Sequence, residues 1–193
     1  MSTATEMPAR DWVAGTWTID AVHSHVGFMI KHMMVSKVRG HFGTFSGTIV
    51  TGATPDTSSV EATIEATSIN TGNPMRDDHV RSADFFDAAE HPQLTFRSTG
   101  VRLVEGDFLI DGDLTIRGVT QPVTLTMGPP EFGPGMEEGT GKAGFSATTE
   151  IVRHDFGVSY NGPIPGGGAA LGDKVSIELE IEADLVSEAE SRS

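Results

Sequence analysis

A strict alternation of apolar and polar residues near the C-terminus constrains the fold of this chain most strongly. From Val175 to Leu185, every odd-numbered residue is apolar and every even-numbered residue is polar, four of the latter being acidic. Side chains alternate across a β-strand, so one face of this segment is buried and the other faces water. A helix would spread the acidic residues around its circumference, so the pattern predicts a strand.

The same alternation recurs along most of the chain, which indicates an all-β fold. Its apolar rows are Trp17/Ile19, Val26/Phe28/Ile30, Val60/Ala62/Ile64/Ala66, Leu94/Phe96, Phe108/Ile110/Gly112/Leu114/Ile116, Val123/Leu125/Met127 and Ala143/Phe145/Ala147/Ile151. Alternation on one face is typical of antiparallel sheets with one solvated side. Seven or more such strands in 193 residues predict a single-domain sandwich or closed barrel.

One segment has helical signals instead. Asn73 is a favourable N-cap, Pro74 suits the first helical position, and Asp77 lies in or near the positively polarised first turn. We therefore expect a short helix within residues 74–89 that caps the sheet. Residues 128–141 and 162–172 are rich in glycine and proline and are expected to be loops. Residues 1–10 and 187–193 are expected to be flexible tails around a domain of residues 11–186.

Small residues in the apolar rows leave two interpretations of the interior open. These residues are Ala62, Ala66, Ser98, Gly112, Ala143 and Ala147. They could leave room for a ligand, as eight-stranded barrels can. Alternatively, they could face large side chains from opposite strands and complete a filled core.

Charge and composition exclude several classes of function. The formal net charge of −14 would repel nucleic acid and an anionic membrane surface. The chain has no cysteine, so it has no disulfide, thiolate metal ligand or thiol nucleophile. No segment approaches the ~18 apolar residues of a membrane span, and the first residues lack the basic and apolar regions of a secretory signal. We therefore expect a cytoplasmic protein that does not insert into membranes.

Histidines are the main candidates for chemistry. His23 and His25 would share one face of a strand, and with Asp20 they could begin a metal site, although no further acidic residue follows before Arg39. The simpler interpretation is that His23 and Ser24 form hydrogen bonds where a strand begins, while His25 is solvated. His32, His41 and His154-Asp155 could act as acids or bases, but a structural polar network at the barrel rim is the favoured interpretation of them. We expect no catalytic residues, no metal and no cofactor.

Four blocks of sequence together resemble the YceI-like polyisoprenoid-binding family. They are residues 17–42 (including Trp17-Thr18-Ile19-Asp20, His23-Ser24-His25-Val26-Gly27-Phe28, Lys31-His32 and Val38-Arg39-Gly40-His41-Phe42), residues 77–98, residues 112–123, and Arg153-His154-Asp155-Phe156-Gly157. The resemblance implies a closed, eight-stranded, antiparallel, lipocalin-like barrel whose tunnel holds an isoprenoid lipid or isoprenoid quinone. Members of the family are described as binders of such lipids, which implies a carrier or store and not an enzyme.

The resemblance and the alternation together predict the ligand-binding residues. The tunnel wall is expected to contain Val26, Phe28, Ile30, Phe96, Leu114, Phe145, Ile177 and Leu179. Phe85 and Phe86 are expected to close or line one end. Motif positions further suggest polar contacts at a mouth from His32, Arg39, Asp77 and Arg81.

Two other classes of function stay open on the sequence alone. One is a metal-assisted hydrolase or isomerase that uses His23, His25 and Asp20. The other is a filled barrel that acts through its surface as a structural or interaction protein, with a homodimer as one form.

Overall fold

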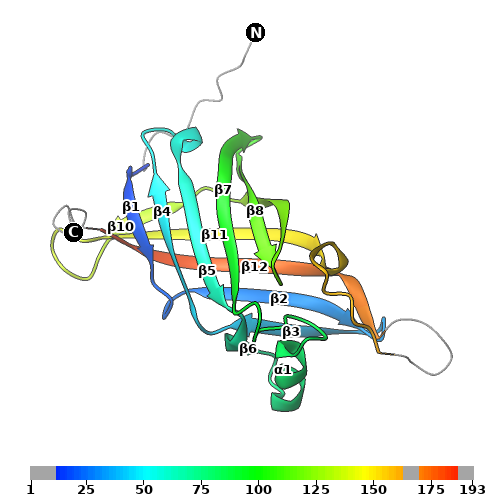
Figure 1. Cartoon of the computed structure of the whole chain (residues 1–193). Coiled ribbons are helices and arrows are strands. Elements are labelled where there is room, and N and C mark those ends of the chain that lie inside the picture. Colours follow the sequence, from blue (N-terminus) through cyan, green and yellow to red (C-terminus); the bar gives the residue numbers. More distant parts are fainter. Residues whose placement is uncertain (1–11, 163–169, 187–193) are drawn as a thin grey trace, which may run out of the picture.

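The computed structural model describes residues 12–162 and 170–186 (Figure 1). The expected tails, residues 1–10 and 187–193, and most of the expected loop at 162–172 lie outside the described residues. The strands are β1 (Gly15–Ile19), β2 (His25–His32), β3 (Ser36–Phe42), β4 (Phe45–Thr51), β5 (Ser59–Glu65), β6 (Ile69–Asn70), β7 (Gln93–Val104), β8 (Asp107–Ile116), β9 (Val119–Met127), β10 (Glu131–Pro134), β11 (Gly141–Val152) and β12 (Leu171–Leu185). The helices are α1 (Pro74–Arg81) and three 3-10 turns, η1 (Pro55–Thr57), η2 (Ala66–Ser68) and η3 (Arg153–Phe156).

The strands close into an antiparallel barrel. Neighbouring strands follow the order β11-β9-β8-β7-β5-β4-β1-β12, and pairing of β12 with β11 completes a ring of eight. The closing pair is long, running from Lys142 opposite Asp184 to Val152 opposite Lys174. The predicted closed eight-stranded barrel is therefore confirmed. Closure satisfies the backbone groups of both strands that would otherwise form sheet edges.

Two bends in the chain, one between β1 and β2 and one between β3 and β4, lengthen one half of the barrel. β1 and β2 run in succession along the same edge of the 15-residue β12, with residues 21–24 between them. β4 pairs with β1 and β3 pairs with β2 in the same way. The segments β2, β3 and the first half of β12 therefore extend beyond β1 and β4, and α1 lies beneath this extension (Figure 1).

The capping helix is shorter than the segment in which it was expected. Asn73 caps it as predicted, its side chain accepting a hydrogen bond from the backbone N–H of Arg76 at 3.1 Å. The helix ends at Arg81 because Ser82 turns the chain, and its backbone N–H and hydroxyl both donate to the carbonyl of His79. Turns follow as far as Glu90. Among the described residues, no helix is long and apolar enough to cross a membrane.

The expected loop at residues 128–141 contains a strand. β10 forms a hairpin with the beginning of β11, with Phe132 opposite Ala143. The ring of Phe132 packs against Trp12 and Trp17, at centroid distances of 5.7 and 5.5 Å. This aromatic packing explains why a segment rich in glycine and proline becomes ordered strand, and it fills the barrel end where β1 begins.

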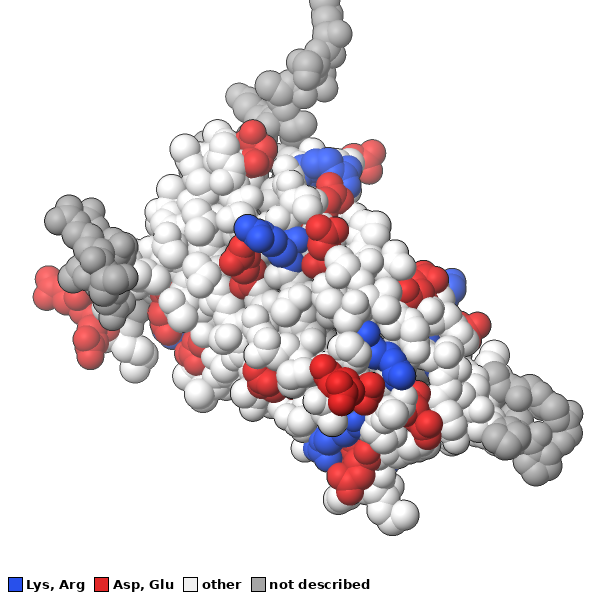
Figure 2. Space-filling view, viewed as in Figure 1, with Lys and Arg blue, Asp and Glu red and all other residues white. Residues whose placement is uncertain are grey.

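Charged side chains are scattered over the outside of the barrel. In Figure 2, acidic and basic residues are interspersed over one face, without a continuous basic patch on that face. The chain has 27 acidic and 13 basic residues, so the overall field is negative. This distribution agrees with the even-numbered polar row of β12, which faces solvent.

The small inward-facing residues serve two purposes. A Cβ on Gly112 would collide with the ring of Phe96, so this glycine accommodates an aromatic neighbour. Gly40 accommodates the ring of Phe28 in the same way. Ala62 and Ala147, in contrast, line an internal cavity. Some small inward-facing residues therefore make room for large neighbouring side chains, whereas others leave space for a cavity.

The contact at Gly112 predicts a local loss of stability. In Gly112→Ala, the new methyl group would meet the ring of Phe96 and lie 2.7 Å from the backbone oxygen of Arg97. We expect the free energy of unfolding, measured by urea denaturation, to fall by about 1–3 kcal/mol, as for other overpacked cores. Gly144→Ala is the matched control, because nothing lies within 4 Å of its Cβ position. Equal stability of the two variants would contradict this packing.

Candidate functional site

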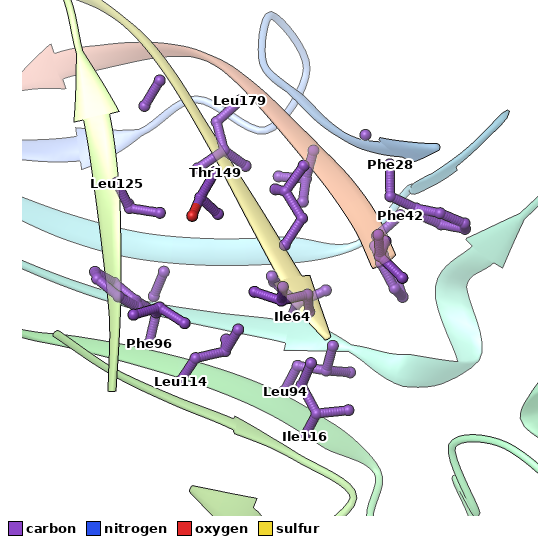
Figure 3. Close-up of a pocket in the computed structure, with 18 of the residues that line it drawn as sticks. Phe28, Phe42, Ile64, Leu94, Phe96, Leu114, Ile116, Leu125, Thr149 and Leu179 are labelled. Atoms are coloured by element: carbon purple, nitrogen blue, oxygen red, sulfur yellow. The ribbon is translucent and has the colours of Figure 1, made fainter. Parts of the chain in front are cut away.

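An apolar cavity of about 490 Å³ occupies the interior of the barrel. Figure 3 shows side chains from strands around the barrel, including Phe28, Phe96, Leu114 and Leu179, pointing into a common space. The volume falls within the ~300–1,000 Å³ typical of small-molecule sites. The interior is therefore not a completely filled core.

The apolar residues predicted to line a tunnel all lie on the wall of this cavity. The positions of those on strands follow from strand parity, since consecutive inward-facing residues are two apart, whereas Phe85 and Phe86 lie in the turns after α1. They are Val26, Phe28, Ile30, Phe85, Phe86, Phe96, Leu114, Phe145, Ile177 and Leu179. Their contact with a ligand stays a prediction.

Of the four polar contacts suggested from motif positions, only His32 lies on the cavity wall. Arg39 is exposed on the outer face of β3, because Val38 and Gly40 on either side of it face inward. Strand parity places Arg39 on this face, and its expected contact with a ligand at a mouth stays a prediction.

Asp77 and Arg81 lie outside the cavity wall and attach the helix to the barrel. Asp77 is buried and accepts hydrogen bonds from the backbone N–H and the hydroxyl of Thr71, at 2.9 and 2.5 Å. Burial raises the pKa of Asp77, but the Thr71 hydrogen bonds and the charge of Arg81 outweigh it, so the net pKa is lowered. Arg81 donates to the carbonyl oxygens of Thr67 and Ile69. The conformation of residues 67–77 thus depends on these two side chains.

A cluster of aromatic rings lies on the cavity wall next to α1. His79, Phe85 and Tyr160 are in mutual contact, with ring centroids 5.0–5.2 Å apart. His79 also contacts the carboxylate of Asp84 through Nε2 at 2.8 Å. Neither His79 nor Tyr160 was expected at a site from the sequence. Their approach depends on the turn after η3, which places Tyr160 beside the helix.

Arg153 is a third cavity residue, besides His79 and Tyr160, that was not expected from the sequence. It lies on the cavity wall and is only 4% exposed. A signal for it was present, because Ala143, Phe145, Ala147 and Ile151 form the inward row of β11. Two residues further along this row is Arg153. β11 ends at Val152, and Arg153, the first residue of η3, is still buried on the side to which this row points.

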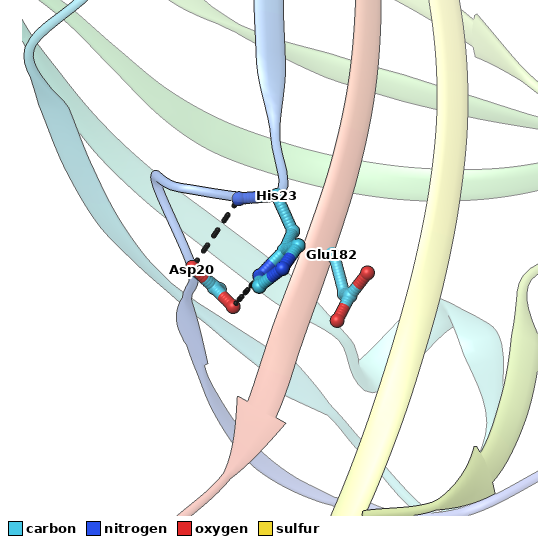
Figure 4. A group of neighbouring side chains, drawn as sticks. All are labelled: Asp20, His23 and Glu182. Atoms are coloured by element: carbon cyan, nitrogen blue, oxygen red, sulfur yellow. Dashed lines mark hydrogen bonds and ion pairs between the residues drawn. The ribbon is translucent and has the colours of Figure 1, made fainter.

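Asp20 and His23 meet where β2 begins (Figure 4). His23 Nδ1 lies 2.7 Å from Asp20 Oδ2, and Glu182 of β12 is close enough that the three side chains could together hold a metal ion. Ser24 forms hydrogen bonds with the backbone of Glu182. His25 is exposed and separate, with its ring over Gly27. His23 and Ser24 thus form the hydrogen bonds expected where a strand begins, and His25 is not part of the group that Asp20 and His23 form with Glu182.

Lys142 supplies a positive charge to the same cluster. Its Nζ lies 2.9 Å from Glu182 Oε1, 2.6 Å from Asp184 Oδ1 and 3.4 Å from Asp20 Oδ2. These carboxylates raise the pKa of Lys142. The hydrogen bond from His23, with help from Lys142, lowers the pKa of Asp20 to about 2. Lys142 and His23 therefore share the three carboxylates of this cluster and offset part of their negative charge.

The Asp20–His23 contact predicts the titration of His23. The Asp20 carboxylate, and more weakly Glu182, raise the pKa of His23 above 6.5. We expect ¹H–¹³C NMR to show this elevated midpoint and Asp20→Asn to return it towards ~6.5. The contact between protonated His23 and Asp20 stabilises the fold fully below the pKa that His23 has in the unfolded chain. This stabilisation is lost as the pH rises through the higher pKa that His23 has in the folded protein. His25→Gln is the control and should leave the His23 midpoint unchanged; the same midpoint in Asp20→Asn as in wild type would refute the pairing.

Comparison with known proteins agrees with this architecture. A UPF0312 protein of Staphylococcus aureus is 36% identical over 171 residues, covering 88% of this chain and 97% of that protein. The Campylobacter jejuni YCEI protein has a TM-score of 0.68 at 29% identity, over 82% of this chain and 91% of that one. A polyisoprenoid binding domain from Saccharophagus degradans shares the fold, with a TM-score of 0.64 at 16% identity, over 90% of this chain and all of that one. The family model for the YceI-like domain matches residues 17–183. The chain therefore belongs to the YceI-like family.

Proposed function

We propose that this protein binds a long isoprenoid chain inside the barrel and carries or stores it. The observation that carries the proposal is the apolar cavity, which is enclosed by alternating residues of nearly every strand of the barrel. The resemblance of the fold to a domain named for polyisoprenoid binding supports it, as does membership of the YceI-like family.

The chemistry of the wall favours a hydrocarbon chain over a compact polar ligand. Within the middle of the barrel, the hydroxyl of Thr149 is already used, because it donates to the carbonyl of Thr124 at 2.9 Å. The neighbouring wall residues Leu125, Ala147 and Leu179 offer no hydrogen bonds from their side chains. Recognition there depends on shape and on apolar area removed from water.

The apolar surface area that a ligand must bury in order to bind is modest. Burial of roughly 300 Å² of hydrocarbon contributes ~7 kcal/mol at ~25 cal/mol per Å². Association costs at least ~4 kcal/mol in lost translational and rotational freedom. A long chain can therefore bind with few polar contacts. Polyprenyl lipids and isoprenoid quinones share such a chain, so the proposal includes both, with the cytoplasm as the proposed location.

Filling the cavity should abolish binding. In Ala147→Phe, a buried residue of the cavity wall becomes a large ring inside the barrel. We expect uptake of geranylgeraniol, measured by native mass spectrometry, to fall at least tenfold, while circular dichroism shows that the β-structure is retained.

Thr148→Phe is the matched control. Thr148 is the next residue of β11 and is exposed on the outer face, so the same ring would leave the cavity open. Its uptake should equal that of the wild type. Unchanged uptake by Ala147→Phe would overturn the assignment of the cavity as the lipid site.

A further inference from the structure

The turn between β2 and β3 exposes apolar side chains on a strained backbone. Met33, Met34 and Val35 form this turn, here called the hairpin tip, and they are 40%, 65% and 88% exposed. Met33 and Met34 both have positive φ, at 53° and 60°. A tight hairpin turn with this backbone favours Asn-Gly, because other L-residues are strained at positive φ. The tip therefore keeps two exposed methionines where asparagine and glycine would be more stable, and such retained strain is typical of functional segments.

The hairpin is basic although the chain as a whole is acidic. Residues 21–55 contain no aspartate or glutamate, whereas the chain has 27 acidic residues. Lys31 and Lys37 lie directly opposite each other across β2 and β3, and Arg39 follows on the outer face of β3. Like charges that lie directly opposite each other destabilise a hairpin. None of these three side chains forms an ion pair with the described residues, whereas Lys174 of β12 pairs with a glutamate.

The hairpin tip lies at one end of the cavity. His32 and Val38, on the two strands that carry the tip, belong to the cavity wall, as does Leu171, which is paired with His32. The backbone N–H of Met33 donates to the carbonyl of Ala170 at 2.8 Å and joins the tip to the beginning of β12. Figure 1 shows β2 and β3 ending together at one extremity of the barrel. A surface that contacts the tip would therefore face this end of the cavity.

We propose that the hairpin tip docks reversibly on the surface of an anionic lipid bilayer. The tip would lie among the upper parts of the acyl chains, with Lys31 and Lys37 beside the lipid phosphates. Its apolar side chains would then leave water, and the two lysines would gain opposite charges. The features that destabilise the free hairpin thus favour the docked one.

The overall charge of the protein does not prevent this contact. The formal net charge of −14 repels an anionic surface at long range. At physiological ionic strength, charges more than ~8 Å apart are largely screened, so the residues nearest to the bilayer decide the interaction. At the hairpin tip these residues are the basic ones. The contact is superficial, since only the three residues of the tip enter the bilayer, and it does not depend on a lipid inside the barrel.

Binding to vesicles, without any isoprenoid, tests the docking. The wild-type protein is mixed at physiological ionic strength with vesicles of phosphatidylcholine, or of phosphatidylcholine and phosphatidylglycerol in equal parts, and the bound fraction is measured by flotation. We expect partitioning into the anionic vesicles to be at least about tenfold stronger, since each basic residue at an anionic surface contributes about fivefold. Equal partitioning into both kinds of vesicle, or into neither, would overturn the inference. Uptake of geranylgeraniol by the same protein reports separately on the proposed function.

A fluorescent label locates the contact on the molecule. The chain has no cysteine, so Met34→Cys and Val22→Cys each provide a single thiol for an environment-sensitive fluorophore. Val22 is the matched control, because it is 87% exposed and lies before β2, at the opposite end of that strand from the tip. We expect anionic vesicles to brighten the emission and shift it to the blue at position 34 only. A shift at both positions, or at neither, would contradict docking through the tip.

A redesigned turn separates docking from folding. The double variant Met33→Asn, Met34→Gly has the sequence that the backbone of this turn prefers, so its melting temperature should equal or exceed that of the wild type. Its partitioning into anionic vesicles should fall at least about tenfold, because the exposed apolar area is removed. Undiminished partitioning of this variant would refute the inference. Self-association of the wild type that the variant loses, without binding to vesicles, would assign the tip to a contact between two copies and refute it as well.

Single charge changes test the role of the lysines. Lys37→Gln should weaken partitioning into anionic vesicles about fivefold and leave the weak partitioning into phosphatidylcholine unchanged. Arg102→Gln is the matched control, because it changes the net charge equally but removes a residue that pairs with Asp111 away from the hairpin. Its partitioning should equal that of the wild type. Equal losses in the two variants would show that net charge governs binding and would contradict a specific role of the hairpin.

Discussion

The pairing of β11 with β12 holds the barrel closed, and the cavity inside depends on it. Both strands alternate apolar and polar residues, and their register places the apolar rows together, with Ala147 opposite Leu179 and Phe145 opposite Ile181. A shift by one residue would turn every inward side chain of one strand to the solvent. Hydrophobic patterning and backbone pairing thus specify the same closure. Lys142 joins the end of this seam to the end of β1 through its contact with Asp20.

Most of the fold could be predicted from the sequence, because the alternation of apolar and polar residues shows which face of a strand each side chain occupies. The rows of Phe28, Leu114 and Leu179 all point inward as their parity requires. The bend between β1 and β2 and the strand at Glu131–Pro134 could not be predicted. Both depend on contacts between distant segments, such as the packing of Phe132 against Trp17.

The residues of the apolar cavity wall could be predicted from the sequence, whereas the polar residues near α1 could not. Arg39 and Asp77 belong to recognisable motifs, yet motif membership does not say which face a side chain occupies. Arg39 faces outward and Asp77 stabilises a loop, whereas Arg153 continues an apolar row into the cavity. The arrangement of His79 and Tyr160 required the tertiary structure, since the two residues lie far apart in the sequence.

The central claim is that the cavity holds a long apolar isoprenoid. Native mass spectrometry of the freshly purified protein, followed by organic extraction and identification of the released compound, tests it most directly. The account predicts a mass increase close to one lipid per chain and a released molecule that carries an isoprenoid chain. Protein that is purified without a bound lipid, and that takes up no added polyprenyl lipid, would contradict it.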